Sequence, residues 1–132
     1  RTGPVGTAML AWQKSRPPGA TVGVIGLGTG SLAYYARPGD SWTFYEIDPT
    51  VERLASDPRY FSFLAECRAA GSKVVLGDAY LRLQEVPPGT FDFLVLDAFS
   101  SDSIPVHLLT REALALYRSR MKPGGVMAFH IS

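Results

Sequence analysis

The chain has 132 residues, of which 46% are hydrophobic and 19% are charged. These values are typical of one packed globular domain and exclude a disordered tail. Thirteen basic and twelve acidic residues give a net charge of +1, so the composition indicates no nucleic-acid partner. The single cysteine, Cys67, excludes an internal disulfide and a cysteine-based zinc site, and it favours a reducing cytoplasm. No apolar run reaches the roughly 20 residues of a membrane span, and no signal peptide is visible.

Residues 1–20 are expected to form a helical or irregular lead-in to the folded domain. Thr7–Lys14 can form one amphipathic helix, and the prolines of the segment 16–19 end it. The side chains expected to be partly buried in this helix are Ala8, Leu10, Ala11 and Trp12. The chain begins at Arg1 and stops directly after an apolar run, so both ends are expected to continue in a longer protein.

An apolar strand then runs directly into a glycine-rich turn. Val22, Val24 and Ile25 suit a buried parallel strand, and glycines follow at positions 26, 28 and 30. Glycine permits a positive φ angle and lets a ligand approach the backbone closely. Ser31–Tyr35 is expected to continue as a helix. A strand, a glycine turn and a helix N-terminus in this order are typical of a nucleoside-binding corner, although such turns also occur as plain connections.

Further strands and helices alternate along the rest of the chain. The expected strands are Ser41–Ile47, Lys73–Leu76, Phe91–Leu96 and Val126–Ile131, and the expected helices are Val51–Ser56, Arg59–Ala70, Ala79–Glu85 and Thr110–Met121. Thr110 is the expected N-cap of the last helix, and Lys122 to Gly125 are expected to end it. This alternation predicts a doubly wound α/β fold with a mostly parallel sheet and right-handed crossovers.

Acidic residues follow the expected strands. Glu46 and Asp48 end the second strand, Asp78 ends the third, and Asp97 ends the fourth with Asp102 close behind. Because the carboxyl ends of parallel strands meet at one edge of the sheet, these carboxylates are expected to surround a ligand there.

Each carboxylate has a physical use at such an edge. Glu46 can accept hydrogen bonds from two ribose hydroxyls. Asp78 can either accept from an adenine amino group or cap the helix that starts at Ala79, and the sequence leaves both readings open. Asp97 and Asp102 suit a cationic amine, which paired carboxylates attract, orient and deprotonate, although Asp102 could equally be a solvated loop residue.

Other polar residues are expected to be structural. Asp48 precedes a proline and favours an N-cap role. His130 lies in an apolar strand, and Cys67 lies on a helix without a nearby histidine, so both are expected to pack. His107 has no partner at metal-ligand spacing, and no metal is expected.

Five motifs in a fixed order carry a family resemblance. They are VIGLGTGSLA, FYEIDP, VVLGDA, FDFLVLDAFSSDSIP and MKPGGVMAFHIS, between Val22 and Ser132. Together they resemble the nucleotide-binding core of class I S-adenosylmethionine-dependent methyltransferases and, more narrowly, the spermidine synthase family, which shares that fold. The resemblance implies a Rossmann-like domain over residues 21–132, with strand order 3-2-1-4-5 and without the final strands of the full fold.

The resemblance also implies roles for individual residues. The implied cofactor-binding residues are Gly26, Gly28, Thr29, Gly30, Glu46, Asp78 and Ala79, and the implied catalytic residues are Asp97 and Asp102. In the family, the glycine turn approaches the methionine-derived part of the donor, and the acids matching Glu46 and Asp78 bind ribose and adenine. The acid matching Asp97 helps to activate the attacking amine in aminopropyltransferases.

The leading hypothesis is therefore a cytoplasmic transferase of polyamine biosynthesis. It would bind S-adenosylmethionine or its decarboxylated form and pass an aminopropyl group to an amine such as putrescine. A methyltransferase is the first alternative, because Thr29 stands where spermidine synthases usually carry an aspartate.

The second alternative is a non-catalytic nucleoside-binding or assembly domain. Val126–Ile131 would leave an exposed apolar edge, so a homo-oligomer is expected, without direct membrane contact. An NAD-linked oxidoreductase is disfavoured, since Ser31 occupies the last glycine or alanine position of its fingerprint.

Overall fold

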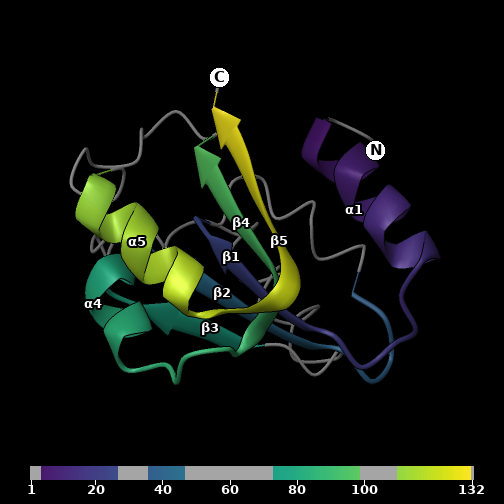
Figure 1. Cartoon of the computed structure of the whole chain (residues 1–132), viewed down its shortest axis with the longest axis horizontal. Helices are drawn as coiled ribbons and strands as arrows, with labels where there is room; N and C mark the ends of the chain where they lie inside the picture. The colour runs from purple at the N-terminus through teal and green to yellow at the C-terminus, as the bar shows by residue number, and fades with distance from the viewer. Residues whose placement is uncertain (1–3, 27–35, 47–72, 99–109, 132) are drawn as a thin grey trace, which may run out of the picture.

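The computed structural model describes residues 4–26, 36–46, 73–98 and 110–131 (Figure 1). The helices are α1 (Pro4–Lys14), α4 (Ala79–Gln84) and α5 (Arg111–Ser119), and the strands are β1 (Thr21–Ile25), β2 (Ser41–Glu46), β3 (Lys73–Leu76), β4 (Phe91–Ala98) and β5 (Met121–Ile131). The helices expected over 31–35, 51–56 and 59–70 lie outside the described residues.

The strands form one parallel sheet in the order β3-β2-β1-β4-β5. This is the α/β class that the alternation of strands and helices predicted, and the order is the one that the resemblance implied. The central strands β1 and β4 carry continuous apolar runs because both of their faces are covered.

Helices cover both faces of the sheet (Figure 1). Met9 and Trp12 of α1 pack on one face against a cluster that includes Val24, Trp42 and Phe93. On the other face, α4 and α5 cover a second cluster, whose buried members are Ile25, Tyr45, Ala79, Leu83, Phe91, Leu94, Leu96, Ala113 and Tyr117. The doubly wound arrangement is thus confirmed. Among the described helices, none has both the length and the apolar character to cross a membrane.

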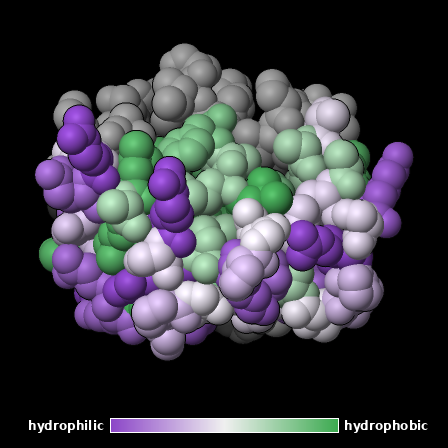
Figure 2. Space-filling view, viewed as in Figure 1, coloured by the Kyte–Doolittle hydropathy of each residue, from purple (hydrophilic) through white to green (hydrophobic). Residues whose placement is uncertain are grey.

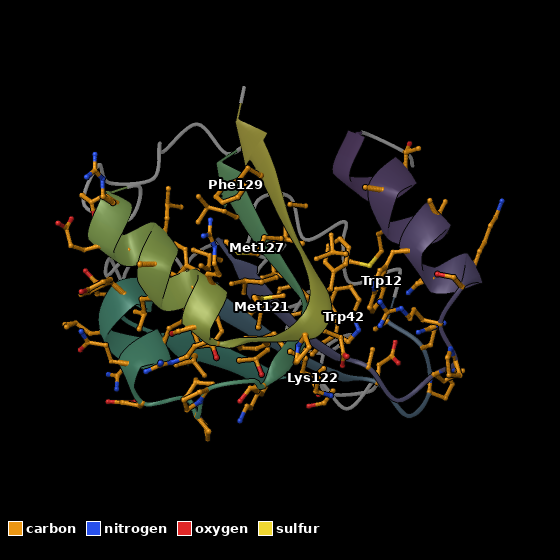
Figure 3. All side chains as sticks on the ribbon, viewed as in Figure 1. Trp12, Trp42, Met121, Lys122, Met127 and Phe129 are labelled. Carbon is orange, nitrogen blue, oxygen red and sulfur yellow. The ribbon has the colours of Figure 1, made fainter. Side chains whose placement is uncertain are left out.

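The burial expected for α1 is right for Trp12 and wrong for the three other residues. Ala8, Leu10 and Ala11 are exposed, whereas Met9 and Trp12 are the buried side chains. Residues three positions apart share a helix face, so α1 docks through this one narrow stripe. The Trp12 ring packs 4.9 Å from the ring of Phe93 between centroids, on the side of the sheet where Figure 3 also shows Trp42. The expected domain boundary after residue 20 stays a prediction.

The start of β5 also differs from the expectation. The last helix ends at Ser119 with Arg120 as its C-cap, and β5 begins at Met121 instead of Val126. Met121 pairs with Phe91 and Val126 with Phe93, so four residues of β5 face one residue of β4. The Pro-Gly-Gly segment is therefore an irregularity inside a strand, in which Gly124 adopts a φ of +78°.

Asp40 joins the segments that enter β1 and β2. Its Oδ1 accepts hydrogen bonds from the backbone N–H groups of Gly19 (2.8 Å) and Ala20 (3.1 Å). Its Oδ2 accepts from the backbone N–H (3.1 Å) and the Nε–H (3.2 Å) of Arg37. Burial alone would raise the pKa of Asp40, but these hydrogen bonds outweigh it and hold the pKa below the ordinary 3.8. Asp40 and the groups that donate to it lie at the amino ends of β1 and β2, opposite the carboxyl edge.

Candidate functional site

Three residues of the expected site meet at one level of the carboxyl edge. The residues that precede Gly26, Glu46 and Asp97 pair with one another across β1, β2 and β4. Ile25 pairs with Tyr45 and with Leu96, and Gly26, Glu46 and Asp97 each follow one of these paired residues. The backbones of the three site residues therefore lie side by side. This is the edge at which ligands of open parallel sheets bind.

Gly26 follows β1 directly and is the one glycine of the predicted turn that the structure describes. Its φ is +90°, a conformation that glycine adopts without steric cost. Its N–H donates a 2.7 Å hydrogen bond to the carbonyl of Tyr45, which holds the start of the turn against β2. Gly28, Thr29 and Gly30 lie outside the described residues.

Glu46 is the last residue of β2. It pairs with Leu76 of β3 through the backbone, so its position at the end of the strand agrees with the expectation. The ribose-binding role of Glu46 stays a prediction.

Asp78 caps α4. Its Oδ1 accepts hydrogen bonds from the backbone N–H groups of Tyr80 (2.8 Å) and Leu81 (3.3 Å). The capping reading is therefore confirmed. A carboxylate has roughly four lone-pair sites, so this cap does not conflict with a further bond to a ligand. The adenine-binding role of Asp78 stays a prediction, as does that of Ala79, which is fully buried at the start of the helix.

Asp97 lies inside a strand that is longer than expected. β4 continues to Ala98, and Asp97 pairs with His130 of β5 through the backbone. Pairing with β5 thus fixes its backbone, and its catalytic role stays a prediction. Asp102, together with Asp48, Cys67 and His107, lies outside the described residues.

Tyr117 of α5 is buried in the same cluster as Ala79. Burial raises the pKa of its phenol, and the negative charge of Asp78 and the neighbouring Tyr80 raise it further. Thirty-eight positions separate Tyr117 from Ala79, and the packing of α5 beside α4 places both in one buried cluster. No local sequence pattern could have found this pair.

Within the described part of the chain, no group of three or more His, Cys, Asp or Glu side chains is arranged to hold a metal ion. Along the described carboxyl edge lie Gly26, with its positive φ, and acidic residues at the ends of neighbouring strands.

Comparison with known proteins gives the family context. No protein-family model matches the chain. A polyamine aminopropyltransferase from Vibrio vulnificus is 35% identical over 109 residues, which are 79% of this chain and 35% of that protein. A probable spermidine synthase from Corynebacterium glutamicum superposes with a TM-score of 0.74 and 22% identity, over 94% of this chain and 45% of that one. The chain is a spermidine synthase-like domain.

The fold of this spermidine synthase-like domain is shared more widely. A methyltransferase from Thiobacillus denitrificans, solved with S-adenosyl-L-homocysteine, has a TM-score of 0.57 and 22% identity, over 95% of this chain and 47% of that one. At such identities the solved structures show the class I methyltransferase fold alone. The domain spans about a third of the length of the curated relative.

Proposed function

We propose that the spermidine synthase-like domain binds an S-adenosyl sulfonium donor at its carboxyl edge and transfers an aminopropyl group to an amine such as putrescine. The observation that carries the proposal is the common level of Gly26, Glu46 and Asp97 on three adjacent strands. The likeness to a polyamine aminopropyltransferase supports this type of transfer.

On the donor side, each described residue has one task. The positive φ of Gly26 starts a turn along which the methionine-derived part can approach the backbone. Glu46 accepts hydrogen bonds from the two ribose hydroxyls, and its charge disfavours a 2′-phosphate. Asp78, already fixed by its cap on α4, accepts a hydrogen bond from the adenine amino group.

On the acceptor side, Asp97 orients the amine and takes its proton. The amine nitrogen forms a bond to the propyl carbon next to the sulfonium sulfur, and the bond between that carbon and the sulfur breaks. Its electron pair stays on sulfur, which leaves as a neutral thioether. The proton released by the new amine goes to the carboxylate of Asp97, with Asp102 assisting. Positioning and proton removal are thus the two contributions of the chain.

The proposal is tested with the variant Asp97→Asn. Turnover of putrescine and decarboxylated S-adenosylmethionine is expected to fall by about 10²–10⁴-fold, the usual contribution of a positioned general base. Donor affinity, measured by calorimetry, is expected to stay within about twofold, because Asp97 acts on the amine.

Asp92→Asn is the matched control for this experiment. Asp92 lies on the same strand at its amino end, where it accepts hydrogen bonds from the Thr21 N–H (2.9 Å) and Lys122 Nζ (3.1 Å). This control is expected to keep its turnover. Full turnover by the Asp97 variant would contradict the role proposed for Asp97.

Methyl transfer is the second candidate function, and Thr29 in place of an acidic residue favours it. Calorimetry with S-adenosylmethionine and its decarboxylated form separates the two functions. Tighter binding of the decarboxylated donor supports aminopropyl transfer, whereas a preference for the intact carboxylate indicates methyl transfer. Binding without turnover of either donor would indicate the non-catalytic alternative. A cytoplasmic location stays a prediction.

A further inference from the structure

Arg82 of α4 places a guanidinium at the carboxyl edge, next to Asp78. Gly77 follows β3 directly, so it lies at this edge, and Asp78 is the next residue (Figure 1). A Cβ atom on Gly77 would lie 2.9 Å from Nε and 3.4 Å from Nη2 of Arg82. The guanidinium therefore lies over the backbone of Gly77, in the space that a side chain on Gly77 would fill.

The local structure explains why the guanidinium reaches this corner. Arg82 lies one helical turn after the N-cap Asp78, and its N–H donates a 2.9 Å hydrogen bond to the Asp78 carbonyl. Long side chains of a helix lean toward its N-terminus, which for α4 is the carboxyl edge. Gly77, with a φ of +128°, has no side chain that would compete for the same space.

The guanidinium is accessible to a ligand at this corner. The Arg82 side chain is 44% exposed, and Nη1 forms an ion pair of 3.5 Å with Oε2 of Glu85, whose side chain is 67% exposed. An exposed ion pair of this kind contributes little to stability, so it does not commit the guanidinium to Glu85. A guanidinium has five N–H donors, of which the bond to Glu85 uses one.

A carboxylate beside a guanidinium matches the polar edge of an adenine base. The amino group of adenine is a donor, and each ring nitrogen next to it, N1 or N7, is an acceptor. Asp78 supplies an acceptor, which its bonds to the N–H groups of Tyr80 and Leu81 hold at the start of α4. Arg82 supplies donors at the same corner.

We infer that Arg82 is a specificity-determining residue that donates a hydrogen bond to a ring nitrogen of the adenine base, beside its amino group. The inference rests on the proposed function, in which Asp78 accepts from that amino group. Asp78 and Arg82 together read a donor and an acceptor on one edge of the base. Recognition by both residues excludes a base that lacks this pair of groups.

The test measures the binding of methylthioadenosine by calorimetry, because this is the neutral thioether that the proposed transfer releases. Two analogues carry carbon in place of N1 or of N7, so each lacks one acceptor beside the amino group. The wild-type chain is expected to bind at least one analogue about five- to twentyfold more weakly than methylthioadenosine. Arg82→Met, which keeps the apolar stem, is expected to reduce this difference to within about twofold for one analogue. Since the difference is a ratio of affinities measured on one sample, the folded fraction cancels.

Glu85→Gln is the matched control, because it removes the ion pair and keeps the guanidinium. It is expected to distinguish the analogues as the wild type does, and a loss equal to that of Arg82→Met would overturn the inference. A wild type that binds both analogues as tightly as methylthioadenosine, or an Arg82→Met variant that distinguishes them equally well, would overturn the inference alone. Wild-type binding of none of the three compounds would overturn the proposed function and this inference with it.

Discussion

Asp40 is the residue at which burial and hydrogen bonding act against each other most directly. Its side chain is 1% exposed, yet the hydrogen bonds from Gly19, Ala20 and Arg37 keep its pKa below the ordinary value. A carboxyl with a lowered pKa in the folded state stabilises the fold fully above its unfolded-state pKa, near 3.8. That stabilisation is lost as the pH falls through the lower folded-state pKa.

The variant Asp40→Asn is therefore expected to be less stable by about 1–3 kcal/mol at neutral pH, because its amide group would meet the donors of Arg37. The difference from wild type should shrink as the pH falls below about 3. Urea unfolding at both pH values measures it. Glu85→Gln is the control, since its exposed ion pair with Arg82 (3.5 Å) is expected to contribute less than about 0.5 kcal/mol. A difference for Asp40→Asn that does not depend on pH would contradict this account.

Among the helices and strands, those with strong local signals were predicted correctly from sequence. Thr110 was expected as an N-cap, and its Oγ accepts the Ala113 N–H at 3.1 Å. Gly26 was expected to allow a turn, and it has the positive φ. In each case the deciding interaction lies within a few residues of the signal.

The errors occur where a distant element decides the local structure. The segment 122–125 was expected to precede the last strand, but it lies inside β5, because Met121 before it and Val126 after it both pair with β4. In α1, the apolar residues surround much of the helix, and only docking against the sheet selects Met9 and Trp12. The burial of Tyr117 in one cluster with Ala79 likewise depends on how α4 and α5 pack. These features follow from tertiary contacts, which one sequence does not reveal.

At the scale of the whole molecule, β5 is an edge strand of the described sheet, and it carries exposed apolar side chains. Val126 is 37% exposed and Phe129 is 43% exposed. Figure 3 shows Met121, Met127 and Phe129 along this strand, and Figure 2 shows a hydrophobic region on the same face between α5 and α1. An apolar edge strand is a template for pairing with another chain. Association of two copies through β5 stays a prediction.

Val126→Lys is expected to shift the chain from dimer toward monomer, because a lysine on an edge strand opposes pairing. Sedimentation velocity over a range of protein concentrations measures the shift, and a tenfold weaker association corresponds to about 1.4 kcal/mol. Leu81→Lys is the control, since Leu81 is 57% exposed on α4, away from this edge. A wild-type chain that stays monomeric throughout, or a control that dissociates equally, would contradict association through β5.

The separation of the core into two clusters has a spectroscopic consequence. Both tryptophans of the chain, Trp12 and Trp42, belong to the cluster under α1, whereas Tyr45 and Tyr117 lie in the cluster under α4 and α5. Tryptophan emission therefore reports the docking of α1, on the face of the sheet opposite to α4 and α5. Comparing emission with far-ultraviolet circular dichroism during unfolding would show whether the two sides of the sheet come apart together.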